Sequence, residues 1–160
     1  MDLTVASKAP ARLRATPSWL VTQIATRAAR LVSQSLAGVG ARRYHFALLA
    51  ALDEFGPASQ ADLGRRCGID RSYIVEAVNE LAAAGLVVRV VDQADRRRNT
   101  VTVTGEGRAR LRSIGEALDD AQGDLLAPLS PQEREQLTAL LGRVLDHAVA
   151  QEQPPATPSR

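Results

Sequence analysis

Hydrophobic residues recur every three or four positions through most of the chain, a spacing that predicts amphipathic helices. We expect one such helix over residues 17–40 and another over 41–55, each ending where glycine or proline interrupts the pattern. Two more are expected over 105–126 and 131–150, and both carry a stripe of leucines. The chain is therefore predicted to be mainly helical.

Two shorter helices are expected between these long ones. Ser59 is placed to cap the first, which would end at Gly68 in a left-handed turn. Asp70 is placed to cap the second, over residues 71–84. The buried stripe of this second helix is expected to consist of Ile74, Val75, Val78 and Leu81.

Strand-like patterns follow the two short helices. Residues 86–91 are rich in valine, and residues 100–104 alternate threonine and valine with a period of two. A charged turn over 92–99 joins them. Two helices joined by a glycine-containing turn and followed by a β-hairpin form a winged helix-turn-helix. The predicted fold class is thus mainly α with a small β-hairpin wing.

The two ends of the chain lack a regular pattern. Residues 1–16 have no clear period and are expected to form a flexible arm, while residues 151–160 contain three prolines and are expected to be disordered. Between them we expect a helix over 17–40, a winged domain over 41–104 and further helices over 105–150.

Charge is unevenly distributed along the 160 residues, although the net charge is only +2. Residues 1–58 hold 7 basic and 3 acidic side chains, residues 59–112 hold 10 and 7, and residues 113–160 hold 3 and 8. A basic front portion suits an anionic partner. All the cations except Lys8 are arginines, whose planar fork fits phosphate and guanine, although a GC-rich genome would also enrich arginine.

The second short helix is the one that enters the major groove in a helix-turn-helix. Arg71 could bond guanine O6 and N7 bidentately, and the hydroxyls of Ser72 and Tyr73 could bind phosphates or base edges. The alternative is that these side chains only solvate a helix start. The residues of the two short helices predicted to contact double-stranded DNA are Ser59, Gln60, Arg71, Ser72, Tyr73 and Asn79.

The hairpin tip adds a second basic feature. Asp95, Arg96, Arg97 and Arg98 place three guanidinium groups on one narrow turn. Such a tip can enter the minor groove, whose negative potential favours arginine. Asp95 is spaced to pair with Arg97 and to fix its direction. The alternative is a solvated run of charges, but its place beside a predicted recognition helix favours DNA contact.

These motifs carry a family resemblance. The stretch from Tyr44 to Leu111 resembles the MarR family of bacterial winged-helix transcriptional regulators. The most specific piece is residues 95–107, which match the family's D-x-R wing, a strand ending in Leu-Thr, and then x-x-Gly; Val103 stands where leucine is usual. Residues 64–72 and 80–87 resemble the family's helix-turn-helix and its exit.

The resemblance implies a homodimer, with residues 17–40 and 105–150 supplying the dimerisation helices. Two recognition helices would then meet successive major grooves of an inverted-repeat operator, as expected of a repressor. By the same resemblance, Arg97 corresponds to the family's minor-groove arginine and Asp95 to its orienting acid. The alternative is a winged-helix dimer that binds only proteins.

The resemblance also implies release of DNA by a small aromatic acid or phenol bound between the dimerisation helices and the winged domain. An acid would need a cation and an aromatic wall. The alternative is packing for the aromatic residues, and phosphate or solvent contact for the arginines. Oxidant sensing by Cys67 is a further alternative, weakened because buried thiols are usually inert. The candidate ligand residues are Trp19, Arg30, Arg42, Arg43, Tyr44 and His45.

Several other classes have no support in the sequence. We find neither a phosphate-binding glycine loop nor a nucleophile beside a base, so no enzyme is expected. His45, His147 and Cys67 lack metal-ligand spacing, and no cofactor is expected. One cysteine excludes an internal disulfide, and neither a membrane span nor an export signal is visible. The expected location is the cytoplasm, at the nucleoid.

Overall fold

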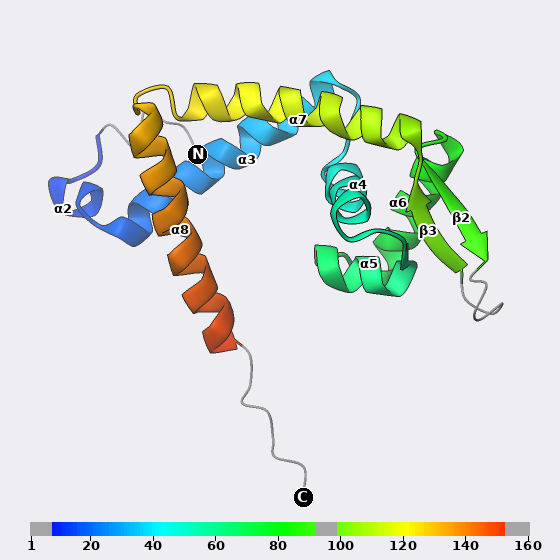
Figure 1. The fold of residues 1–160 in the computed structure, drawn as a ribbon. Coiled ribbons are helices and arrows are strands. Elements are labelled where there is room, and N and C mark those ends of the chain that lie inside the picture. The colour runs from blue at the N-terminus through cyan, green and yellow to red at the C-terminus, as the bar shows by residue number, and fades with distance from the viewer. Residues whose placement is uncertain (1–7, 92–98, 153–160) are drawn as a thin grey trace, which may run out of the picture. The chain divides into compact units, whose positions relative to one another are not determined.

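The computed structural model describes residues 8–91 and 99–152 (Figure 1). These residues belong to two compact units, the first ending at Leu125 and the second beginning at Leu126. The structure confirms the predicted fold class of a mainly helical chain with a small antiparallel sheet. The elements of the first unit are α2 (Ala11–Arg14), α3 (Pro17–Gly38), α4 (Arg43–Phe55), β1 (Ala58–Ser59), α5 (Gln60–Cys67), α6 (Arg71–Ala83), β2 (Val87–Val91), β3 (Asn99–Val103) and α7 (Gly105–Leu125). The second unit contains α8 (Pro131–Glu152).

The structure adds the elements α2 and β1 to those predicted and moves some of the predicted ends. The short helix α2 lies within the segment expected to be an arm, and α8 continues through Glu152, two residues into the predicted tail. The wing is also larger than a hairpin. Strand β1 pairs with β3, giving the order β1-β3-β2, with Ala58 opposite Val101. A two-residue strand has no detectable period, so the sequence pattern missed it.

The capping predictions give a mixed outcome. Ser59 Oγ accepts from the Asp62 amide at 3.2 Å, and Gly68 has φ +63°, so the predicted start and end of α5 are confirmed. The predicted Asp70 cap is wrong, because its side chain makes no capping hydrogen bond. Its carboxylate still lies at a helix N-terminus, where the helix dipole favours negative charge.

Helices α4, α5 and α6 surround a core of leucine, isoleucine and valine side chains, closed by the inward residues of the sheet and by α7. In α6, Val75 was predicted to be buried but is 45% exposed, and Ala77 is buried instead. The buried face of α6 is therefore narrower than the spacing of its apolar residues in the sequence suggested. The largest fully buried side chains are Leu48, Leu49, Leu52, Leu63, Leu81, Ile114, Val78, Val87 and Val101.

Helix α7 begins with a close backbone contact. Thr104 Oγ1 accepts from the Gly107 amide at 2.9 Å and donates to the Gly85 carbonyl at 2.8 Å, so one hydroxyl ties the start of α7 to the turn before β2. A Cβ atom at Gly107 would overlap the Leu86 carbonyl oxygen and lie 2.7 Å from Val103 Cγ2. This crossing of helix and strand thus requires glycine.

The second unit begins with a capping box. The Ser130 amide donates to Glu133 Oε2 at 2.8 Å, and the Glu133 amide donates to Ser130 Oγ at 3.4 Å. Hydrogen bonds from the Ser130 side chain and then its backbone lower the pKa of Glu133. Arg134 Nε donates to the carbonyls of Leu126 and Leu129, which holds the turn before α8. The predicted start of this helix is confirmed.

Helices α3 and α8 each expose several large apolar side chains along one stretch. No described residue of α8 is buried, and most of its predicted apolar stripe is exposed within its own unit, with Val144 68% exposed and Leu137 half-buried. Such a stripe is costly to leave in water. The large apolar side chains exposed on α3 and α8 are Leu20, Val21, Ile24, Leu140, Leu141, Val144, Leu145 and Val149.

Replacing Gly107 with alanine should destabilise the protein by about 1–3 kcal/mol, because the backbone of Leu86 must move to admit the methyl group. Gly115→Ala is the matched control in the same helix, since nothing lies within 4 Å of its Cβ position. It should be neutral or stabilising by up to about 1 kcal/mol. Guanidinium unfolding at fixed protein concentration, followed by circular dichroism, measures both; equal effects would contradict the close contact.

Candidate nucleic-acid interface

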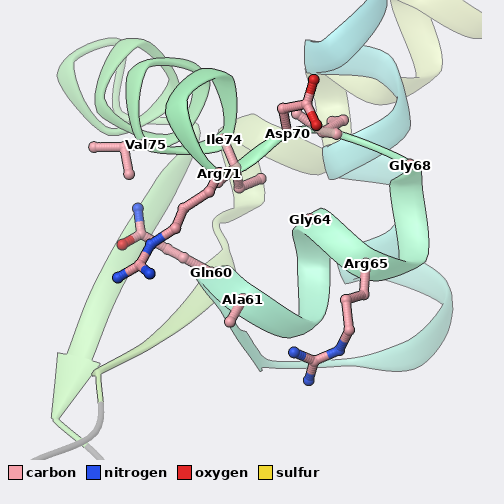
Figure 2. A pocket seen from close by; sticks show the side chains of 10 residues that line it. Gln60, Ala61, Gly64, Arg65, Gly68, Asp70, Arg71, Ile74 and Val75 are labelled. Carbon is pink, nitrogen blue, oxygen red and sulfur yellow. The ribbon is translucent and has the colours of Figure 1, made fainter.

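The N-terminal turn of α6 carries the first part of the site. Arg71 and Ser72 are exposed there, while Ile74, immediately after this turn, is buried against the core. The free amides of a helix start also attract phosphate. Arg71 and Gln60 line a hollow of about 840 Å³ between α5 and α6. Figure 2 shows both side chains among those that line it, together with Arg65. The turn therefore presents cationic and polar donors together.

The two predicted contacts at the start of α5 differ in their availability. The Ser59 hydroxyl donates to Asp62 Oδ2 at 2.6 Å while accepting from the Asp62 amide, so it serves the cap. The Gln60 amide nitrogen is buried and has no hydrogen-bond partner among the described residues. An unpaired donor beside Arg71 can be satisfied by an anionic oxygen entering this hollow.

Asn79 lies two turns further along the exposed face of α6. Arg89 of β2 donates from Nη2 to Asn79 Oδ1 at 2.5 Å. Because arginine has no acceptor, the amide oxygen must face Arg89, and the amide NH₂ is left as a donor. Sequence reasoning missed Arg89. A signal was available, because Arg89 lies two positions after the buried Val87 and therefore on the same face of β2.

The tip of the wing falls outside the described residues. Asp95, Arg96, Arg97 and Arg98 all belong to this segment. Its two flanking strands are paired antiparallel, with Val90 opposite Thr100, so a hairpin leads into the segment and out of it. Their role in the minor groove stays a prediction.

A second hollow, which we call the tyrosine hollow, lies between α4 and α6. It measures about 260 Å³. The Tyr44 and Tyr73 rings stack there, with centroids 6.1 Å apart and planes at 25°. Tyr73, predicted as a DNA contact, is therefore packed toward α4 rather than standing alone on the groove face. The lining residues are Arg42, Tyr44, His45, Tyr73, Glu76, Ala77 and Glu80.

Glu80 joins the two cationic candidates of this hollow. Its Oε1 lies 2.9 Å from Arg42 Nη1, and its Oε2 lies 2.8 Å from His45 Nε2. The His45 side chain is 17% exposed, against 65% for Arg42, so the His45–Glu80 contact is more protected from solvent than the Arg42–Glu80 contact. Sequence reasoning missed Glu80, because pairing across 35 positions leaves no local signal.

The structure brings together only half of the predicted ligand residues. Arg42, Tyr44 and His45 line the tyrosine hollow, whereas Trp19 and Arg30 of α3 and Arg43 of α4 do not. Trp19 is half-buried, and both arginines are exposed.

Cys67 packs at the edge of the core. Its thiol lies 3.5 Å from the Ala47 carbonyl oxygen. Burial raises the pKa of this thiol above its ordinary value of 9.0, and the nearby Arg66 guanidinium only partly opposes that shift. A raised pKa leaves little thiolate at neutral pH, which disfavours oxidant sensing.

The part of the chain that the structure describes contains neither a metal-ligand cluster nor a helix that could cross a membrane. Its histidine, cysteine and acidic side chains form no group of three suited to a metal ion. No helix in residues 8–91 and 99–152 combines the length and apolar character needed to cross a bilayer.

Comparison with known proteins agrees with this geometry. The sequence profile of the MarR family matches residues 37–98. PecS, an HTH-type transcriptional regulator of Dickeya dadantii, is 35% identical over 81 residues, which are 51% of this chain and 49% of PecS. The chain spans about half the length of PecS and of a second curated relative, a "putative transcriptional regulatory protein" of Thauera aromatica.

Solved structures extend the likeness beyond the winged unit. A "probable transcriptional regulator" from Pseudomonas aeruginosa is 35% identical, with a TM-score of 0.68, and the match covers 82% of this chain and 98% of that one. BpsR of Bordetella bronchiseptica, whose DNA binding is regulated by 6-hydroxynicotinic acid, is 25% identical, with a TM-score of 0.69 and coverage of 86% and 99%.

Iodoacetamide should alkylate Cys67 several-fold more slowly in the native protein at pH 8 than after unfolding in guanidinium, because the folded chain favours the neutral thiol. By the same linkage, this group's stabilising contribution is present below pH 9.0 and is lost as pH rises through the raised folded pKa. Mass spectrometry of quenched samples gives both rates. Native alkylation as fast as that of the unfolded chain would restore the redox hypothesis.

Proposed function

Because this chain belongs to the MarR family of winged helix-turn-helix transcriptional regulators, we propose that it binds double-stranded DNA sequence-specifically as a homodimeric repressor. The observation that carries the proposal is the exposed first turn of α6, where Arg71 and Ser72 stand on a helix held by its buried opposite face. Arg71 reads a guanine, and the amide NH₂ of Asn79 donates to a base or phosphate acceptor. The protein acts at the nucleoid, in the cytoplasm.

The wing completes each half-site. Arg97 enters the minor groove beside the recognition helix, and Asp95 orients it. Support comes from the run of three arginines at residues 96–98 and from the paired strands that lead to it. Arg89, which ties β2 to Asn79, links the wing to the recognition helix.

Dimerisation is supported by the apolar side chains that the single chain leaves exposed. Within its own unit, α8 leaves most of its apolar stripe exposed, and the first turns of α3 leave Leu20, Val21 and Ile24 exposed. A second copy of the same chain would bury them, and a twofold axis would present two α6 helices to an inverted repeat. Residues 17–40 and 105–150 supply this interface.

The tyrosine hollow is the proposed effector site. It is formed by α4 and by the recognition helix α6, so a ligand there touches the element that reads DNA. A ligand that binds better to one arrangement of α6 shifts the equilibrium toward it and so alters DNA affinity. The aromatic wall of Tyr44 and Tyr73 favours a small aromatic ligand, and regulation of BpsR by an aromatic acid supports such a role.

Replacing Arg71 with alanine should reduce discrimination between operator and random DNA by about 1–3 kcal/mol at one base pair per half-site. Fluorescence anisotropy would use a duplex selected from a random library by the unmodified protein, with a shuffled duplex beside it. Arg112→Ala, an exposed arginine of α7, is the matched control and should leave discrimination unchanged.

Equal losses on both duplexes would make Arg71 a phosphate contact. Absence of DNA binding by the unmodified protein at low salt would overturn the DNA-binding proposal itself, because phosphate contacts strengthen as salt falls.

Replacing Val144 with aspartate should raise the dimer dissociation constant on the order of 100-fold, because the interface would bury an unpaired charge. The matched control is Ala139→Asp, which adds the same residue to the other side of α8. Sedimentation velocity over a concentration series distinguishes the two variants. A V144D protein that sediments as the unmodified dimer would remove this stripe from the interface.

A further inference from the structure

The walls of the tyrosine hollow limit the size of its ligand. Its volume of about 260 Å³ falls below the roughly 300–1,000 Å³ typical of sites for drug-sized molecules. Tyr44 and Tyr73 are both partly exposed, so the stacked pair still offers ring surface to a ligand. One aromatic ring with a short polar arm is the size of molecule that fits.

The groups that would recognise a carboxylate are already occupied. Arg42 and His45 both bind the Glu80 carboxylate, at 2.9 Å and 2.8 Å. An ionised carboxylate only accepts, so His45 Nε2 carries the shared proton. A ligand acid would have to displace Glu80, whose side chain is 32% exposed, and leave that charge partly buried without its partners.

A second carboxylate is available in the same hollow. Glu76 lies one helical turn before Glu80 on α6, and the described residues give it no hydrogen bond or ion pair. The lining holds two carboxylates, Glu76 and Glu80, against the single guanidinium group of Arg42. Anions are repelled by such a lining, while a cation gains both Glu76 and the negative faces of the tyrosine rings.

We propose that the tyrosine hollow binds a small aromatic cation, such as a protonated aromatic amine, and discriminates against aromatic carboxylates. Glu76 pairs with the positive charge of the ligand, and the tyrosine rings contact its aromatic ring. Glu80 occupies Arg42 and His45, so these two residues are not available to bind a ligand carboxylate. This inference rests on the effector role proposed above for the same hollow.

Three probes of one skeleton test the charge preference: tyramine (cation), tyrosol (neutral) and 4-hydroxyphenylpropionate (anion). Ligand-observed NMR titration of the full chain should give a dissociation constant for tyramine on the order of tenfold below that of the carboxylate, with tyrosol between them. Only tyramine should change the anisotropy of the bound operator duplex at low concentration.

Two variants locate the charge. Glu76→Gln should weaken tyramine binding by up to about fivefold and leave the affinity for tyrosol unchanged. Unchanged tyrosol binding would show that the variant has lost the charge of Glu76 and not its fold. Glu80→Gln should increase the affinity for 4-hydroxyphenylpropionate several-fold, because Arg42 and His45 would no longer be paired with the Glu80 carboxylate. Glu116→Gln, an exposed acid of α7 outside the hollow, is the matched control and should change none of the three affinities.

The outcomes separate this inference from the proposed function. Carboxylate binding as tight as tyramine binding, with release of DNA, would overturn the charge preference and leave the effector role standing. Tyramine binding that Glu76→Gln does not weaken would overturn Glu76 as the anchor. Failure of all three probes to bind would remove the effector role as well, whereas DNA binding is judged separately by Arg71→Ala.

Discussion

The buried face of α6 is the constraint on which both candidate sites depend. Ile74, Val78 and Leu81 are almost fully buried, and this apolar contact fixes the rotation of the helix about its axis. Once that rotation is set, Arg71 and Asn79 must stand on the outer face, and Glu80 must lie toward α4. Electrostatic and hydrogen-bonding groups therefore occupy positions that hydrophobic burial has chosen.

Ion pairs and hydrogen bonds then connect α6 to its neighbours on two sides. Glu80 joins it to Arg42 and His45 at the start of α4, and Asn79 joins it to Arg89 of the wing strand β2. Each contact is modest by itself, because partly exposed pairs contribute little to stability. Their value is positional, since they determine which polar atoms of the recognition helix remain for DNA or for a ligand.

Helix α8 differs from this core in physical character. It is well capped by Ser130 and Glu133, yet within its own unit none of its described side chains is buried. Capping defines where a helix begins, whereas burial of an apolar stripe supplies most of its stability. The apolar stripe that includes Val144 can therefore stabilise α8 only when a second surface buries it.

The sequence by itself determined the order and approximate bounds of the helices, the winged topology, and details such as the Ser59 cap and the left-handed Gly68, because helical period, capping and glycine conformation are local properties. It did not determine that β1 would join the sheet, since a two-residue strand exists only through its partner β3. Nor did it place Val75 outside the core, because the packing of neighbouring elements decides which apolar residues of a helix are buried. The Glu80 pairs and the tyrosine stack join residues 29 to 38 positions apart, so tertiary structure alone decided the shape and charge of that hollow.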